Sequence, residues 1–86
     1  MSNEESKEIV QILKSGKIFK DTETVQGFIE FYYNEDDEEF VKYSEIIMDD
    51  LYNPETEIKN LSESQFRKYL EKNYEYDFVI SNLFES

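Results

Sequence analysis

Cysteine and histidine are both absent from this chain of 86 residues. Without cysteine it can form neither a disulfide framework nor a thiolate zinc site. Without histidine it also lacks the other common catalytic side chain, so Ser-His-Asp and Cys-His arrangements are excluded. Carboxylate pairs could still act as acid and base, but they need a shaped, partly buried pocket, for which so small a domain has little room. We therefore expect no enzymatic activity.

Glycine, proline and long apolar runs are scarce. The two glycines, Gly16 and Gly27, lie too far apart for a G-x-G-x-x-G or Walker phosphate-binding loop. No apolar run approaches the length of a membrane span, and the first twenty residues contain no apolar stretch typical of a secretory signal. We expect a single acidic domain over residues 1–86, located in the cytoplasm, which would be the host cell cytoplasm if a phage encodes it.

Basic residues are also few, and the net charge is −12. The imbalance lies in the middle of the chain, because residues 21–63 hold fourteen acids and only two lysines, whereas both flanks are close to neutral. Such a domain repels phosphate, and it has no basic patch. Direct binding to nucleic acid or to an anionic membrane surface is therefore not expected.

The first predicted element is a helix over residues 3–15. Ser2 with Glu5 forms the S-x-x-E pattern of a capping box, and apolar residues then recur at helical spacing. Gly16 supplies the residue that commonly ends a helix in the left-handed conformation.

A short strand over residues 17–20 and a turn at Asp21-Thr22 lead into a predicted hairpin. Residues 25–33, VQGFIEFYY, favour a strand with aromatic side chains on both faces, which indicates a central strand or one at a subunit contact. The acidic run then connects it to residues 40–48, which return antiparallel. A helix is the alternative for residues 36–52, with the acids in its first turn. Strand is preferred because Val, Tyr and Ile dominate.

The last third of the chain is predicted to contain a second helix. Residues 55–61 are interpreted as a polar connection, and Ser62 with Gln65 forms another capping box that opens a helix to about Lys72. Residues 74–81 alternate apolar and polar, which predicts a final strand, with a helix over residues 74–83 as the alternative. The predicted class is α+β, a small antiparallel sheet of three or four strands with two helices.

The run Glu35–Glu39 is the motif on which a functional hypothesis rests. An extended peptide advances about 3.3 Å per residue and one DNA strand about 3.4 Å per charge, so an extended EDDEE run has the charge density of a nucleic-acid strand. Carboxylates could replace phosphate oxygens as acceptors for Lys and Arg, and nearby tyrosines could add cation–π contacts. The predicted partner-binding residues are Glu30, Glu35, Asp36, Asp37, Glu38, Glu39, Glu45, Asp49, Asp50, Tyr32, Tyr33 and Tyr43.

Simpler interpretations of the same residues remain open. The acidic run could be a solvated hairpin loop that only resists aggregation, and the tyrosines could be half-buried sheet residues. The run has no glycine at the sixth position of a calcium loop and the wrong ligand spacing, so no dedicated metal site and no cofactor are expected.

In length, acidity, aromatic content and lack of catalytic side chains, the chain resembles the small phage-encoded DNA-mimic inhibitors. This class includes HU inhibitors, anti-CRISPR proteins and uracil-DNA glycosylase inhibitors. The resemblance rests on the charge of residues 21–63 and on the NEDDEE run, and no motif selects one member. It implies a non-enzymatic inhibitor that blocks the DNA-binding surface of a basic host protein, such as the nucleoid protein HU or a CRISPR effector. These families do not share a fold, so no residue roles follow from it.

A second hypothesis is a small regulatory or adaptor protein that binds its partner through an aromatic surface. Its affinity would come from a desolvated centre such as Phe28, Tyr32 or Tyr43. With either function, a homodimer is possible, because a short sheet with apolar groups on both faces needs to be covered.

Overall fold

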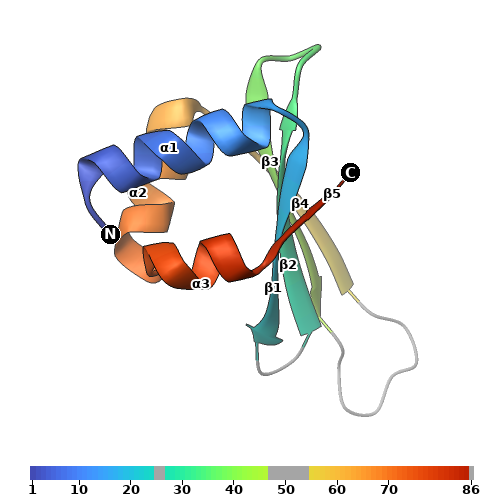
Figure 1. The fold of residues 1–86 in the computed structure, drawn as a ribbon. Helices are drawn as coiled ribbons and strands as arrows, with labels where there is room; N and C mark the ends of the chain where they lie inside the picture. Colours follow the sequence, from blue (N-terminus) through green and yellow to red (C-terminus); the bar gives the residue numbers. More distant parts are fainter. Residues whose placement is uncertain (25–26, 47–54, 86) are drawn as a thin grey trace.

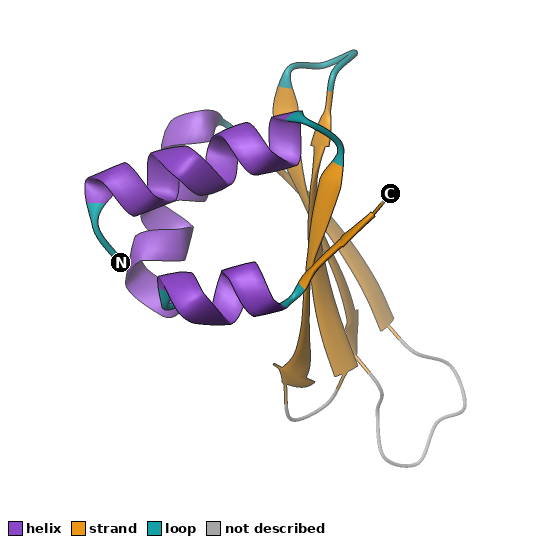
Figure 2. Ribbon diagram, viewed as in Figure 1, coloured by secondary structure: helices purple, strands orange, loops and turns teal. Residues whose placement is uncertain are grey.

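Three helices lie on one side of a five-stranded antiparallel sheet in the described part of the chain (Figure 1, Figure 2). The computed structural model describes residues 1–24, 27–46 and 55–85. The strand order is β4-β3-β2-β1-β5. The elements along the chain are α1 (Asn3–Lys14), β1 (Lys17–Thr24), β2 (Gly27–Asn34), β3 (Glu39–Ile46), β4 (Glu55–Leu61), α2 (Glu63–Asn73), α3 (Tyr76–Ser81) and β5 (Leu83–Glu85). The predicted α+β class is confirmed, with more strands and one more helix than expected.

Both long helices begin at the capping boxes that the sequence predicts. The Ser2 hydroxyl accepts a hydrogen bond from the Glu5 N–H at 3.1 Å, and the Glu5 carboxylate accepts one from the Ser2 N–H at 2.8 Å. Ser62 and Gln65 form the same reciprocal pair at 3.2 and 2.9 Å. After α1, Gly16 has a φ of 110°, a conformation in which a residue with a Cβ would be strained.

The middle of the chain forms the predicted hairpin. β2 is the central strand of the sheet and pairs with β3 from Gly27↔Ile46 to Asn34↔Glu39. Residues 35–38 form the connecting turn. The helix alternative for residues 36–52 is therefore wrong as far as Ile46, and the remainder of that range lies outside the described residues.

The core lies between the helices and the sheet, and phenylalanines occupy its centre. Phe19 and Phe31, on neighbouring strands, stack with ring centroids 5.6 Å apart, and Phe40 stacks on Phe66 of α2 at 4.5 Å. Each fully buried side chain of this size contributes about 1.5–3 kcal/mol. The buried apolar cluster comprises Ile9, Val10, Leu13, Phe19, Phe31, Phe40, Phe66, Leu70 and Val79.

Residues 55–61 correct one prediction, because they form β4 and not a polar connection. The strand pairs with β3 along its whole length, from Ile46↔Glu55 to Phe40↔Leu61. Every residue of β4 except Leu61 is exposed. An edge strand that is uncovered on both faces needs few apolar side chains, so its period-two pattern carries little hydrophobic signal.

Residues 74–81 correct a second prediction, because most of them form the helix α3 and not a strand. Val79 is fully buried in the core, whereas Ile80 is 37% exposed. Tyr74 stacks on Phe78, four residues later, with ring centroids 5.9 Å apart. The burial of Val79 against the core outweighs the alternation of the sequence, and the last strand, β5, begins only after this helix.

The predicted turn at Asp21-Thr22 is also wrong, since β1 continues through both residues to Thr24. Asp21 is only 8% exposed. Its carboxylate accepts hydrogen bonds from the Tyr74 hydroxyl at 2.7 Å and from the Glu23 N–H at 3.0 Å. These donors compensate for the burial of a charged group within the strand.

We call the side of the sheet away from the helices the open face. Because side chains alternate along a strand, the sequence neighbours of the buried Phe19, Phe31 and Phe40 point to it. The residues of the open face are Ile18, Lys20, Phe28, Glu30, Tyr32, Asn34, Glu39, Val41, Tyr43, Glu45, Thr56, Ile58, Asn60 and Phe84.

Candidate partner-binding surface

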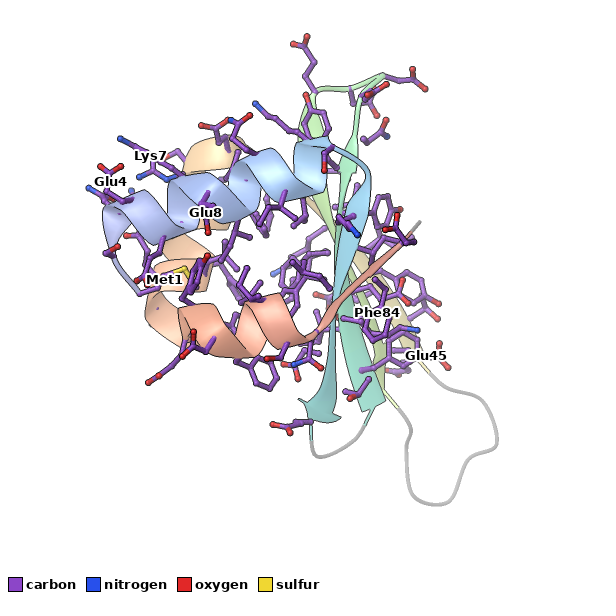
Figure 3. The ribbon with its side chains drawn as sticks, viewed as in Figure 1. Met1, Glu4, Lys7, Glu8, Glu45 and Phe84 are labelled. Atoms are coloured by element: carbon purple, nitrogen blue, oxygen red, sulfur yellow. The ribbon has the colours of Figure 1, made fainter. Side chains whose placement is uncertain are left out.

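The acidic residues predicted to bind a partner are concentrated at the turn between β2 and β3. The side chains of Glu35, Asp36, Asp37 and Glu38 are exposed at one end of the sheet, and Glu39 is half-buried at the start of β3. Figure 3 shows carboxylate groups of this turn beyond the ends of the strands. We call Glu35–Glu39 the acidic hairpin.

Asn34 holds the acidic hairpin in its turn conformation. Its side-chain oxygen accepts a hydrogen bond from the Asp36 N–H at 3.0 Å, and its Nδ2 donates to the Asp37 carboxylate at 3.2 Å. This is the local bonding by which asparagine stabilises turns. Glu38 has a φ of 53°, in the left-handed region that a non-glycine residue enters at some cost. The chain thus keeps four carboxylates close together against their mutual repulsion.

The turn changes one expectation about the charge pattern. In an extended run the carboxylates would follow one another like the phosphates of a DNA strand, but residues 35–38 do not form an extended strand. Their charges are therefore grouped at the tip of the hairpin and are not spaced along a line. Such a group resembles a small cluster of phosphates more than it resembles a length of backbone.

No lysine or arginine within the described residues forms an ion pair with the acidic hairpin. The nearby Lys14, at the end of α1, directs its Nζ to the Glu63 carboxylate at 3.0 Å. That hydrogen bond is the main reason why the pKa of Lys14 is raised, and Glu38 makes only a minor contribution. The negative charge of the hairpin is therefore available to an external cation.

The charge excess belongs to the sheet layer. The helices α1, α2 and α3 carry six acids and five basic residues, whereas β1 to β4 with the β2–β3 turn carry eleven acids and four lysines. The predicted concentration of charge in the sequence thus corresponds to one layer of the molecule.

Glu30 and Glu45 lie on the open face and not in the acidic hairpin. Glu30 forms an ion pair with Lys20 on β1, with Nζ and Oε1 3.1 Å apart, so its charge is partly neutralised. Glu45 accepts a long hydrogen bond from the Tyr43 hydroxyl at 3.4 Å. Glu39 and Glu45 stand at opposite ends of β3, about 20 Å apart for six steps along a strand. The structure therefore separates the predicted acids into two groups.

The predicted tyrosines also divide between the two faces. Tyr32 and Tyr43 point to the open face, where Tyr43 contacts Phe28 with ring centroids 6.0 Å apart. Tyr33 points to the helices, packs on the core and contacts the Phe40 ring at 5.0 Å. Tyr33 therefore does not share a face of the sheet with Tyr32 and Tyr43, although it lines the same groove as Tyr32. Asp49 and Asp50 lie outside the described residues.

An open groove of about 380 Å³ separates the acidic hairpin from the end of α1. Aromatic, basic and acidic side chains line this groove beside the hairpin. Its lining residues are Leu13, Lys14, Gly16, Tyr32, Tyr33, Asn34, Glu35 and Asp36.

Two exposed apolar side chains on the open face were not predicted as binding residues. Ile58 on β4 is 61% exposed and Phe84 on β5 is 51% exposed. Figure 3 shows Phe84 and Glu45 on the same side of the sheet, away from the helices. The signal that could have identified Ile58 is the alternation in ETEIKNL, which places it between two charged neighbours.

Within the described residues, no group of three or more acidic side chains is arranged to hold a metal ion. In the same part of the chain, no helix is long and apolar enough to cross a membrane. Comparison of the chain with protein-family models, curated proteins and solved structures gives no match.

Proposed function

We propose that this protein is a non-enzymatic inhibitor that occupies the DNA-binding surface of a basic host protein. The acidic hairpin would accept hydrogen bonds from lysines and arginines that otherwise contact DNA phosphates. Binding would release cations associated with the crowded carboxylates, as DNA binding releases cations condensed on the phosphates. The site of action would be the cytoplasm, where such DNA-binding proteins are found.

The observation that supports this proposal most directly is the unpaired state of the acidic hairpin. Some acids elsewhere in the described chain have internal cations, as Glu30 has Lys20 and Glu63 has Lys14. Within the described residues the five adjacent hairpin acids have none, although Lys14 stands beside them. Crowded, unpaired carboxylates destabilise the free protein, and a basic partner would relieve that repulsion.

Tyr32 adds a second feature to this surface. It belongs to the open face and also lines the groove beside Glu35 and Asp36. An arginine that binds the hairpin carboxylates could therefore also stack on an aromatic ring.

The test compares two variants with identical charge changes. In the hairpin variant, Glu35→Gln, Asp36→Asn and Glu38→Gln remove three charges and leave the Asn34–Asp37 bond in place. In the control variant, Glu4→Gln, Glu75→Gln and Asp77→Asn remove three charges from exposed side chains of the helical layer.

Displacement of labelled DNA from a panel of basic DNA-binding proteins, with HU among them, is measured over a range of salt concentrations. The hairpin variant should compete at least about tenfold less well, a loss of about 1.4 kcal/mol. The control variant should compete like the unmodified protein, and competition should weaken as salt rises. Equal competition by the two variants, or no competition with any member of the panel, would contradict the proposal.

The exposed apolar groups of the open face favour a second candidate, an adaptor that binds through aromatic contacts. Ile58 and Phe84 are more than half exposed. Phe28 and Tyr43 form an aromatic pair between them on the same face. Binding of this kind would depend little on salt and would tolerate the hairpin variant. The same titration therefore distinguishes the two functions.

A further inference from the structure

We propose that β4 is a self-complementary edge through which two copies of this chain pair antiparallel, joining their sheets into one. This inference is independent of the proposed function, since it concerns a different edge of the molecule. Its basis is the exposure of β4 and the order of charges along it.

Among the strands that the structure describes, β4 is the outer one on its side of the sheet and pairs only with β3. Six of its seven residues are exposed, so the helices do not cover it. One row of its backbone N–H and C=O groups is therefore free to bond to another strand. The opposite outer strand, β5, has only three residues and offers a much shorter edge.

The sequence of β4, ETEIKNL, is complementary to itself about Ile58. In an antiparallel pair with a two-fold axis at Ile58, Glu57 of each copy stands opposite Lys59 of the other copy. Thr56 then faces Asn60, and Glu55 faces Leu61. In this register no like charges stand directly opposite each other. A shift that centres the pair on Glu57 would instead set two carboxylates face to face, which is unfavourable.

The existing sheet also favours a carboxylate beside Lys59. Its direct partner on β3 is Lys42, and like charges in this position repel. Lys42 is held over the Tyr69 ring at 4.8 Å, whereas the pair of Lys59 with Glu57 in its own strand is loose, at 3.9 Å. Glu57 from a second copy would place a negative charge on the free side of Lys59.

The two-fold axis determines which faces of the two sheets lie on the same side of the dimer. Because directly opposite residues of antiparallel strands point to the same side, the open faces of both copies become continuous. Ile58, which is 61% exposed in the single chain, then contacts its own counterpart. A charge of −12 on each copy opposes association, but beyond about 8 Å this repulsion is largely screened at physiological salt. The contact is therefore local and isologous.

Charge exchange along β4 tests the pairing. Glu57→Lys sets lysine against lysine twice across the axis, and Lys59→Glu sets carboxylate against carboxylate. Each single substitution should raise the dimer dissociation constant roughly tenfold or more. The double variant Glu57→Lys with Lys59→Glu restores both opposite-charge pairs and should dimerise like the unmodified chain.

Glu55→Lys is the matched control, because it makes the same charge change on the same face of β4 but stands opposite Leu61. It should leave the dimer intact. Sedimentation equilibrium over a concentration series gives the dissociation constants, and circular dichroism checks that each variant is folded. Hydrogen exchange should show β4 amides that are protected in the dimer and lose protection in the Glu57→Lys variant.

A monomer at every concentration would overturn the proposal. So would a dimer that survives both single substitutions, or a double variant that remains monomeric while it is folded.

Discussion

Single residues in this protein have roles that their type does not reveal. Asp21 is an acid in a strongly acidic chain, yet it is buried and accepts a hydrogen bond from the Tyr74 hydroxyl. Burial and this hydrogen bond raise the pKa of Tyr74 above its usual value of about 10. The pair thus joins β1 to the end of α2 and stabilises the fold while Tyr74 keeps its proton.

Tyr74→Phe should lower the free energy of unfolding at pH 7 by about 1–3 kcal/mol, because Asp21 remains buried without that donor. The variant should also respond differently to alkaline pH. Above about pH 10 the unfolded chain releases the Tyr74 proton while the folded chain retains it, so the stability of the unmodified protein falls as pH rises.

Without Tyr74 this decline should be shallower by up to about 1.4 kcal/mol per pH unit. Urea unfolding of both proteins between pH 7 and pH 11 measures the difference. An identical pH dependence would show that Tyr74 is not protected from ionisation in the folded state.

Secondary-structure elements in this chain depend on local bonds to different degrees. α2 has a complete capping box between Ser62 and Gln65, whereas α3 has no side-chain cap and has six residues. Local sequence therefore specifies α2, and tertiary packing specifies α3.

Ser62→Ala should destabilise the protein by about 1 kcal/mol, because one N-terminal amide of α2 loses its acceptor. Ser64→Ala is the control, since Ser64 is exposed in the first turn of the same helix, and within the described residues its side chain forms no hydrogen bond. It should be neutral or slightly stabilising, as alanine has the higher helix propensity. Chemical denaturation of the two variants gives the comparison, and equal losses would contradict a role for the cap.

The same distinction explains which elements the sequence could predict. α1, α2 and the β2–β3 hairpin were predicted correctly because their caps, their turn and their apolar spacing are local signals. β4 was missed because an edge strand that is exposed on both faces has few apolar side chains, so its sequence shows little of the apolar alternation that identifies a strand. For α3 the sequence preferred a strand and left a helix as the alternative, because the burial of Val79, which decides for helix, depends on contacts with distant elements.

For the candidate site, the clustering of Glu35–Glu39 could be predicted from the sequence, but the side chains that the other predicted residues contact within the chain could not. That Glu30 faces Lys20, or that Tyr33 faces the core, depends on strand register, and register follows from pairing across the sheet.

At the scale of the whole molecule, the two layers differ in charge. The helical layer is nearly neutral, and the strands and hairpin carry most of the excess negative charge. Self-repulsion within one layer should weaken the folded state, and dissolved salt should reduce it.

The urea midpoint should therefore rise as sodium chloride is added. The variant with Glu35→Gln, Asp36→Asn and Glu38→Gln should have a higher free energy of unfolding at low salt, by roughly 1 kcal/mol, since each like-charge contact costs a few tenths. It should also gain less from salt than the unmodified protein. A stability that does not change with salt would show that the hairpin charges are already well separated by solvent.

The pairing of β5 with β1 has a consequence for how the chain is made. Phe19 on β1 stands opposite Leu83 on β5, so one border of the sheet is completed by residues synthesised long after the strand that they cover. A nascent chain on the ribosome can form its hairpin early, but β1 stays uncovered until β5 has emerged. Newly made molecules therefore pass through an interval in which this border can capture a neighbouring chain.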